Sequence, residues 1–330
     1  MSARSLVKRE FAALMPVCAA SMTLLCAIAQ AAYPEKPIRY LVPYPPGGAG
    51  DLMGRSLAQK LSERLGQQII VDNRAGASGT LAAEATAAAA PDGYTLMGAA
   101  MQTHVINVSM MPNLRYDAVK DFTPISLTHT LPRVLIVNAS VPVRNVADLI
   151  ALAKKSPGAL TYSSAGNGST GQLAGELFKQ MTGVDMVHVP YKGSGPAVND
   201  LLAGRISLTF DSVAVWGEHM RTGKVRAIGA TSLARMRTLP DVPTIAEQGL
   251  PGYEMSNWFG MVGPANLPRD IVTRLHADIG QAMADAELRK TLLGVAIEPQ
   301  HSTPEEFAAI IRNDIARWGK VVKGAGIKID

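Results

Sequence analysis

Cysteine is scarce in this sequence, and its two cysteines, Cys18 and Cys26, both lie near the N-terminus. Once that segment is removed, the chain has no disulfide, no thiolate metal site and no cysteine nucleophile. The six histidines lack the spacing of metal ligands. The positive charges form no basic run, so nothing indicates binding to nucleic acid. These absences argue against a disulfide-stabilised protein, a metalloprotein, a cysteine-dependent enzyme and a nucleic-acid-binding protein.

The N-terminal segment has the features of a secretory signal peptide. A basic region over residues 4–9 precedes an apolar stretch over residues 11–28, and Ala29-Gln30-Ala31 fits a cleavage site. An uncleaved membrane anchor and a lipoprotein site at Cys26 are the alternatives. No later stretch is apolar for long enough to span a bilayer. We therefore expect residues 1–32 to be a signal peptide and the mature chain to enter the periplasm.

The rest of the chain alternates short apolar runs with helical patterns, which is typical of an α/β fold. The expected strands cover residues 38–43, 68–71, 95–99, 134–137, 160–163, 186–189, 207–211 and 225–231. The expected helices cover residues 51–65, 80–90, 146–155, 170–182 and 195–203, and two final helices begin at Pro268 and Thr303. No flexible linker separates the halves, so we expect two chain crossings near residues 131–134 and 254–258.

Three glycine-rich turns follow expected strands and open expected helices, at residues 45–51, 165–171 and 191–196. The first turn of a helix has unpaired amides and a partial positive charge, and glycine lets a ligand approach them closely. In open α/β sheets such sites lie at the carboxyl ends of strands. One such turn could be an ordinary connection, but three in one chain favour a site for a carboxylate or phosphate.

Two enzyme motifs are matched only in part. Gly166, Gly168 and Gly171 fit the dinucleotide pattern G-x-G-x-x-G, but no acidic residue follows the next strand. Ser169 has Asn167 two residues before it, so the G-x-S-x-G pattern of serine hydrolases is not met. We therefore expect no catalytic residues, no cofactor and no metal, and we predict that the protein is not an enzyme.

Several polar residues have both a binding and a structural interpretation. Asp51 either contacts a ligand or caps its helix, and capping is favoured. Asp211 ends a strand, where a pocket role and a structural role are equally open. His104 is a candidate pocket residue. Lys192 and Arg133 are the cations best placed to face an anion, although a solvated role is the default for both.

Seven segments of the chain, taken together and in order, match a known family. They are residues 33–38, 45–51 with Arg55, 71–77, 91–96, 121–125, 189–193 and 243–252. Almost from end to end, the mature chain resembles the Bordetella uptake gene (Bug) family. These are the substrate-binding receptors of tripartite tricarboxylate transporters. The number and order of the matching segments make the resemblance specific.

The resemblance implies a periplasmic-binding-protein-like (type II) α/β fold, a two-lobed Venus flytrap in which each lobe is a mixed sheet flanked by helices. The first lobe would comprise residues 33–133 and 257–330, and the second residues 134–256. Backbone amides, hydroxyls and ordered waters would hold the ligand carboxylates more than salt bridges do. The implied ligand contacts are Pro46, Gly47, Gly48, Asp51, Thr103 and His104 in the first lobe, and Gly166, Asn167, Ser169, Thr170, Gly193 and Asp211 in the second.

The resemblance also implies the function. We expect a monomeric periplasmic receptor that captures a small carboxylate, such as a di- or tricarboxylate, an acidic amino acid or an aromatic acid. It would deliver this ligand to the membrane subunits of a tripartite tricarboxylate transporter. A sensor that presents the carboxylate to a membrane histidine kinase is the alternative. Tyr44 replaces the phenylalanine common in the family, and Met101-Gln102 replaces smaller residues, so the ligand stays open.

Overall fold

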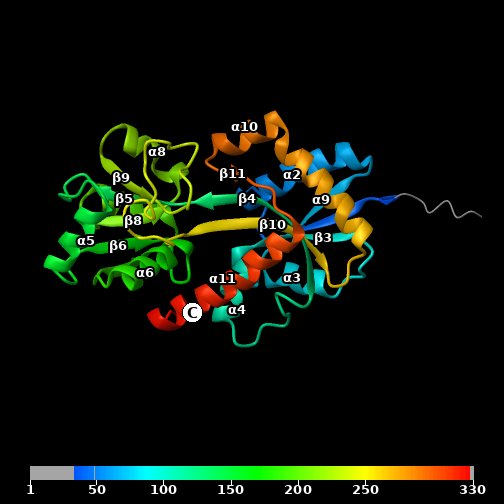
Figure 1. The fold of residues 1–330 in the computed structure, drawn as a ribbon, viewed down its shortest axis with the longest axis horizontal. Helices are drawn as coiled ribbons and strands as arrows, with labels where there is room; N and C mark the ends of the chain where they lie inside the picture. Colours follow the sequence, from blue (N-terminus) through cyan, green and yellow to red (C-terminus); the bar gives the residue numbers. More distant parts are fainter. Residues whose placement is uncertain (1–32, 48, 328–330) are drawn as a thin grey trace, which may run out of the picture. The chain divides into compact units, whose positions relative to one another are not determined.

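Two mixed β-sheets form the framework of residues 33–47 and 49–327, the part of the chain that the computed structural model describes (Figure 1). The first sheet has six strands in the order β11-β4-β10-β3-β1-β2. They are β1 (Ile38–Val42), β2 (Ile69–Asn73), β3 (Thr95–Ala100), β4 (Phe122–Pro132), β10 (Ser256–Pro264) and β11 (Glu298–Pro299). The second sheet has the order β7-β6-β8-β5-β9. Its strands are β5 (Val134–Asn138), β6 (Thr161–Ser164), β7 (Val187–Pro190), β8 (Leu208–Asp211) and β9 (Val225–Ala230).

The strand directions determine where the glycine-rich turns lie. In the first sheet β1 is parallel to β2 and β3, whereas β10 is antiparallel to β3 and β4. In the second sheet β6 is parallel to β7 and β8, and β5 is antiparallel to β8 and β9. The turns after β1 and β6 therefore leave the carboxyl edges of parallel strands, which is the usual location of ligand sites in α/β folds.

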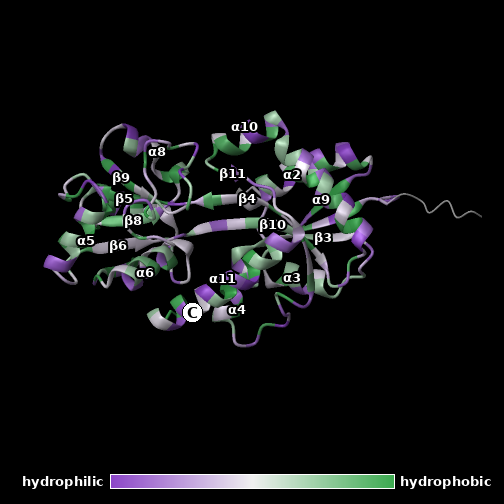
Figure 2. Ribbon diagram, viewed as in Figure 1, coloured by the Kyte–Doolittle hydropathy of each residue, from purple (hydrophilic) through white to green (hydrophobic). Residues whose placement is uncertain are grey.

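Helices cover both sheets. Those joined to the first sheet are α2 (Ala49–Leu65), α3 (Thr80–Ala87), α4 (Asn107–Met110), α9 (Arg269–Ala284), α10 (Ala286–Gly294) and α11 (Pro304–Ala325). Those of the second are α5 (Val146–Lys155), α6 (Thr170–Thr182), α7 (Ser194–Leu202) and α8 (Val213–Arg221). Two short irregular helices, η1 (Ala77–Gly79) and η2 (Gln102–Ile106), follow β2 and β3. Figure 2 shows hydrophilic and hydrophobic residues alternating along α11, as expected for a helix with one buried face.

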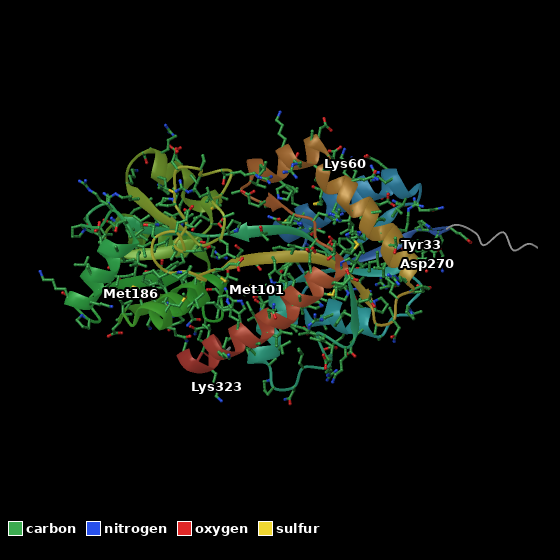
Figure 3. All side chains as sticks on the ribbon, in the orientation of Figure 1. Tyr33, Lys60, Met101, Met186, Asp270 and Lys323 are labelled. Carbon is green, nitrogen blue, oxygen red and sulfur yellow. The ribbon has the colours of Figure 1, made fainter. Side chains whose placement is uncertain are left out.

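The hydrophobic core is continuous between the two sheets. It includes Leu41 and Met97 of the first sheet, Trp258 of β10, and Leu135 and Phe210 of the second sheet, none of which is more than 3% exposed. Met101, which Figure 3 labels, is fully buried at the end of β3 and belongs to the same cluster. The burial of these side chains removes apolar surface from water and supplies most of the driving force for folding.

The antiparallel strands β4 and β10 connect the two sheets. They pair along the full length of β10 and run side by side between the sheets in Figure 1. Only Arg133 separates β4 from β5. The chain returns to the first sheet at β10, and just before this strand Met255 N donates to Thr231 O over 2.8 Å. The end of α11 contacts the second sheet's helices, because Gln180 Nε2 donates to Val321 O over 3.1 Å. The two mixed sheets with flanking helices are confirmed, whereas the residue limits of the lobes stay predictions.

Most local predictions are confirmed, and the differences have physical reasons. The predicted bounds of α5 and α6 agree with the structure, since Asn145 and Ser169 cap their starts with side-chain hydrogen bonds. The helix expected over residues 80–90 ends at Ala87. Within the described ranges, no helix has both the length and the apolar content to cross a membrane. The predicted signal peptide, residues 1–32, lies outside the described residues.

Candidate functional site

The turn between β1 and α2 is held together by the carboxylate of Asp51. This side chain is only 4% exposed and accepts hydrogen bonds from Gly47 N (2.9 Å), Asn73 Nδ2 (2.8 Å) and Arg55 Nε (3.0 Å). Burial alone would raise the pKa of Asp51, but the hydrogen bonds from Arg55, Gly47 and Asn73 outweigh it and lower the pKa. Asp51 is therefore ionised and fixes the turn from inside.

The residues around Asp51 in this turn include several predicted ligand contacts. Gly47 has a φ of 84°, a left-handed conformation that favours glycine, although an added Cβ would meet nothing within 4 Å. Pro46 and Gly47 are exposed. Gly48, also a predicted ligand contact, lies outside the described residues. Glycine is thus favoured at position 47 by the backbone conformation, and not because a side chain there would clash.

The turn between β6 and α6 is fixed by its own side chains. Gln172 Oε1 accepts from Gly168 N over 2.7 Å, and Ser169 caps α6 by accepting from Gln172 N over 3.4 Å. Gly166 and Gly168 have φ values of 134° and 72°. The turn therefore presents the capping hydroxyl and the unpaired first-turn amides of α6 in one defined conformation.

The third turn, between β7 and α7, is attached to the second. Gly193 N donates to Ala165 O over 3.1 Å, and Tyr191 N donates to Ser164 O over 3.0 Å. Gly193 has a φ of 94° at the start of α7, and the side chain of Lys192 is exposed. The second and third turns therefore form one rigid unit at the carboxyl edge of the second sheet.

One cavity joins the first and second turns. It has a volume of about 380 Å³. Its lining residues are Pro43, Tyr44, Pro45, Gly76, Ser78, Gly79, Gln102, Thr103, Asn167, Gly168 and Ser169. None of these described lining residues has a charged side chain. The cavity thus offers amides, hydroxyls and carboxamides, which together suit a small anionic or polar molecule.

Two other cavities, of about 310 and 330 Å³, lie beside β4 and β10. Their lining includes Glu254, Ser256 and, in the first of them, Trp258 and Arg317. They contain none of the described residues of the three glycine-rich turns. The cavity at the turns is therefore the one that agrees with the site expected from the sequence.

Comparison with known proteins identifies the class of this molecule. Residues 53–327 match the family model described as the tripartite tricarboxylate transporter family receptor. The chain is 36% identical to Protein BugT of Bordetella pertussis over 298 residues, which are 90% of this chain and 91% of BugT. This protein belongs to the tripartite tricarboxylate transporter receptor family. The family is one of solute-binding receptors and not an enzyme class, and the predicted membership of the Bug family is confirmed.

Solved structures of similar receptors confirm the fold. Rpa4515 of R. palustris, solved with adipate, is 38% identical, with a TM-score of 0.72 over 90% of this chain and 99% of that chain. MatC of Rhodopseudomonas palustris, solved with bound malate, is 32% identical, with a TM-score of 0.67 over 88% of this chain and all of that chain. The receptor therefore has the two-lobed α/β fold of periplasmic binding proteins.

Only some of the predicted contacts line the cavity of this receptor. Thr103, Asn167 and Ser169 are among its described lining residues, whereas Thr170, Gly166 and Gly193 lie in or beside the same turns. The direct contact of each with a ligand stays a prediction. What the structure establishes is that residues from both lobes reach one cavity.

His104 lies in the core of the receptor behind Thr103. It is fully buried, its Nδ1 is 2.9 Å from Thr103 Oγ1, and its ring packs against Phe122 at 4.7 Å. Burial lowers the pKa of His104 to about 3, so the ring is neutral. His104 is absent from the described lining of the cavity, and the structure gives it a place among core aromatic side chains.

Asp211 is engaged by partners within the protein. Its Oδ1 accepts from Arg133 Nη1 over 3.0 Å, and its Oδ2 accepts from Trp216 Nε1 over 3.1 Å. Burial lowers the pKa of Arg133, while the neighbouring Asp211 carboxylate opposes that shift. The cation that the sequence left open as an anion partner is therefore paired with the receptor's own carboxylate.

Sequence reasoning named Tyr44 and Gln102 as positions that shape the pocket, and both line the cavity, but it missed the segment from Gly76 to Gly79. Ala77 and Ser78 have φ values of 46° and 55°, which are uncommon for residues other than glycine. Asn107 Nδ2 holds Ser78 by donating to its carbonyl over 3.0 Å. The family match at residues 71–77 was the available signal, but nothing in it indicates a left-handed backbone.

Proposed function

We propose that this receptor binds a small carboxylate in the cavity between the Tyr44–Pro45 turn and the Asn167–Ser169 turn. The observation that carries the proposal is the cavity itself, about 380 Å³ in volume and lined by both turns. It accepts an anion through hydrogen bonds, because the start of α6 supplies unpaired amides and a partial positive charge. The receptors of R. palustris that hold adipate and malate support a carboxylate as the ligand.

Ser169 is the side chain best suited to contact the carboxylate. It lines the cavity and caps α6, so its hydroxyl lies where the first-turn amides converge. A hydrogen bond from a neutral group to a charged one contributes about 1.5–3 kcal/mol. The Ser169→Ala variant should therefore bind about tenfold more weakly or worse.

Calorimetry with a panel that contains adipate, malate, tricarboxylates, acidic amino acids and aromatic acids tests the proposal. Ser212→Ala is the matched control, because Ser212 also caps a helix, α8, but lies outside the cavity lining. Lys192→Ala should also bind normally, since the exposed ammonium of Lys192 lies outside that lining. Binding that Lys192→Ala abolishes and Ser169→Ala preserves contradicts the proposed site, and failure of the whole panel contradicts the ligand class.

We also propose that the receptor is exported by its N-terminal segment and acts as a monomer with the membrane subunits of a tripartite transporter. Intact-mass measurement of periplasmic protein should give a chain that starts near Ala32 or Tyr33. Light scattering should give the mass of one chain. Uptake of a labelled ligand should fall in cells whose receptor is Ser169→Ala and not in cells whose receptor is Ser212→Ala. Uptake that is independent of the receptor contradicts the transport role.

A further inference from the structure

A histidine outside the cavity is linked by hydrogen bonds to both ends of the second glycine-rich turn. His188 lies on β7, beside Tyr162 of β6, and their rings are 4.9 Å apart. His188 Nε2 is 2.7 Å from Ser164 Oγ, and His188 Nδ1 is 3.2 Å from Gln172 Nε2. Ser164 ends β6 and Gln172 lies in the first turn of α6, so His188 bridges the two elements that the turn connects.

The partners of His188 determine which ring nitrogen carries the proton. Gln172 Nε2 can only donate, so His188 Nδ1 has to accept and is unprotonated. The orientation of the Gln172 carboxamide is determined independently, because its Oε1 accepts from Gly168 N over 2.7 Å. The neutral imidazole therefore carries its proton on Nε2 and donates it to Ser164 Oγ.

Each partner of His188 holds one glycine of the turn. Ser164 Oγ accepts from Gly166 N over 3.2 Å and donates to Gly166 O over 3.0 Å. Gln172 holds Gly168, which lines the cavity together with Asn167 and Ser169. Each hydrogen bond of this network joins one donor to one acceptor while the imidazole is neutral.

A proton on His188 Nδ1 breaks this pattern in either orientation of Gln172. If the carboxamide keeps its orientation, two donors face each other at Nδ1. If it rotates by half a turn, its NH₂ group faces the amide N–H of Gly168 instead. One hydrogen bond is lost in both cases, and the lost bond costs more where water cannot replace it.

We propose that His188 is a positioning residue that holds the Gly166–Gly168 turn in its binding shape only while its imidazole is neutral. Ligand affinity therefore falls on acidification. This inference rests on the proposed function, since it concerns the same carboxylate site. A simple charge effect predicts the opposite, because an imidazolium near the site attracts an anion. The direction of the pH dependence thus separates the two mechanisms.

The charged groups around His188 come from α6. Glu176 and Lys179 pair with each other over 3.1 Å, and Tyr162 OH donates to Glu176 Oε1 over 2.6 Å. Burial lowers the pKa of His188 below 6.5, Glu176 raises it and Lys179 lowers it. The imidazole is therefore neutral at pH 7 and takes up its proton only at acidic pH.

The first test needs no ligand, and its main measurement uses the wild-type protein. In ¹H–¹⁵N spectra of the full mature chain, the Gly168 amide should titrate with the same midpoint as the His188 ring. Its proton should move upfield at low pH, because its hydrogen bond to Gln172 is lost. His188→Gln should abolish this titration, and His219→Gln, which removes a histidine from the last turn of α8, should preserve it. A Gly168 amide that does not respond while His188 titrates overturns the proposal.

The second test measures the affinities for adipate and malate at pH 7.5 and at one pH unit below the His188 midpoint found in the first test. The wild-type receptor should lose about tenfold more affinity than His188→Gln between these pH values, because only about a tenth of the rings then stay neutral. Protonation of the ligand affects both proteins equally and cancels in this comparison. Equal losses, or a gain in the wild type, overturn the role of His188. If neither acid binds at pH 7.5, the proposed function fails for these probes, while the Gly168 titration still decides the role of His188.

Discussion

Arg133 and Asp211 form an ion pair, Nη1 to Oδ1 over 3.0 Å, that ties the junction of β4 and β5 to the end of β8. The two side chains are only 20% and 10% exposed, so water screens the pair poorly. Removal of one partner from a buried pair leaves the other charge uncompensated. The pair therefore supports the framework of the site, and a direct contact of Asp211 with the ligand stays a prediction.

The first prediction is that Arg133→Met lowers the free energy of unfolding by about 3 kcal/mol. Asp211 would keep its bonds from Ser212 and Trp216 but lose its cation. Urea denaturation measures the change. Arg221→Met is the control, because the Arg221–Glu218 pair is 73% and 65% exposed and should contribute little to stability. An equal effect of both substitutions contradicts the structural role of the Arg133–Asp211 pair.

The second prediction concerns acid. Burial lowers the pKa values of His104 and His129 from 6.5 to about 3 in the folded protein. As the pH falls below 6.5, the unfolded chain takes up protons at these rings and the folded chain does not. The stabilisation is therefore complete above pH 6.5 and is lost between pH 6.5 and pH 3. At pH 4.5 each ring should lower the free energy of unfolding by about 2.5 kcal/mol relative to its value at pH 7.

The histidine variants isolate this contribution from that of the carboxylates. His104→Gln should reduce the stability difference between pH 7 and pH 4.5, measured by urea denaturation at both pH values. The exposed His301 provides the control, and His301→Gln should leave the difference unchanged. An unchanged pH dependence in His104→Gln contradicts the lowered pKa of this ring.

The third prediction concerns the packing of α6 against β8. A Cβ added at Gly171 would lie 2.9 Å from the carbonyl oxygen of Phe210, closer than real Cβ atoms approach. Gly171→Ala should therefore lower the free energy of unfolding by about 1–3 kcal/mol and weaken ligand binding by displacing the start of α6. In contrast, Gly217→Ala in α8 meets nothing within 4 Å and should be neutral or stabilising. Thermal unfolding of the two variants in parallel provides the measurement.

The fourth prediction concerns the turn that Asp51 holds. Asp51→Ala removes the acceptor for Gly47 N, Asn73 Nδ2 and Arg55 Nε, and should cost about 2–3 kcal/mol of stability. Ligand affinity should fall as well, because the turn beside Tyr44 loses its internal support. Asp51→Asn keeps an acceptor and should cost less in both measurements. A variant with normal stability and lost binding would instead indicate that Asp51 contacts the ligand directly.

The elements that the sequence predicted correctly are those with local signals. The start of α11 combines Thr303 as cap, Pro304 at the first helical position and Glu306 in a capping box, and the structure shows all three. The two chain crossings near residues 131–134 and 254–258 were predicted, but the bounds of β4 and β10 were not, because each strand is held mainly by the other across more than a hundred residues of chain. Gly260 within β10 lies against the ring of Phe307, and a local sequence pattern cannot predict a contact between residues so far apart in the chain.

The candidate site was predictable to a similar extent. The glycine-rich turns follow local rules, so their positions after β1, β6 and β7 could be inferred. The partners of polar side chains could not, because Asp211 meets Arg133, and His104 meets Phe122, only after the sheets have formed. The contribution of Ser78 to the cavity depends on a left-handed backbone that no residue type there requires.

The position of β10 in the first sheet limits when this protein can first bind its ligand. Because β10 lies between β3 and β4, the chain up to β9 lacks the strand that joins β3 to β4. A chain that ends before residues 256–264 would expose the unpaired edges of β3 and β4. Tyr44 and Gln102, which line the cavity, follow β1 and β3 of this incomplete sheet. Ligand binding therefore requires a chain that extends through β10, and shorter fragments should have no affinity.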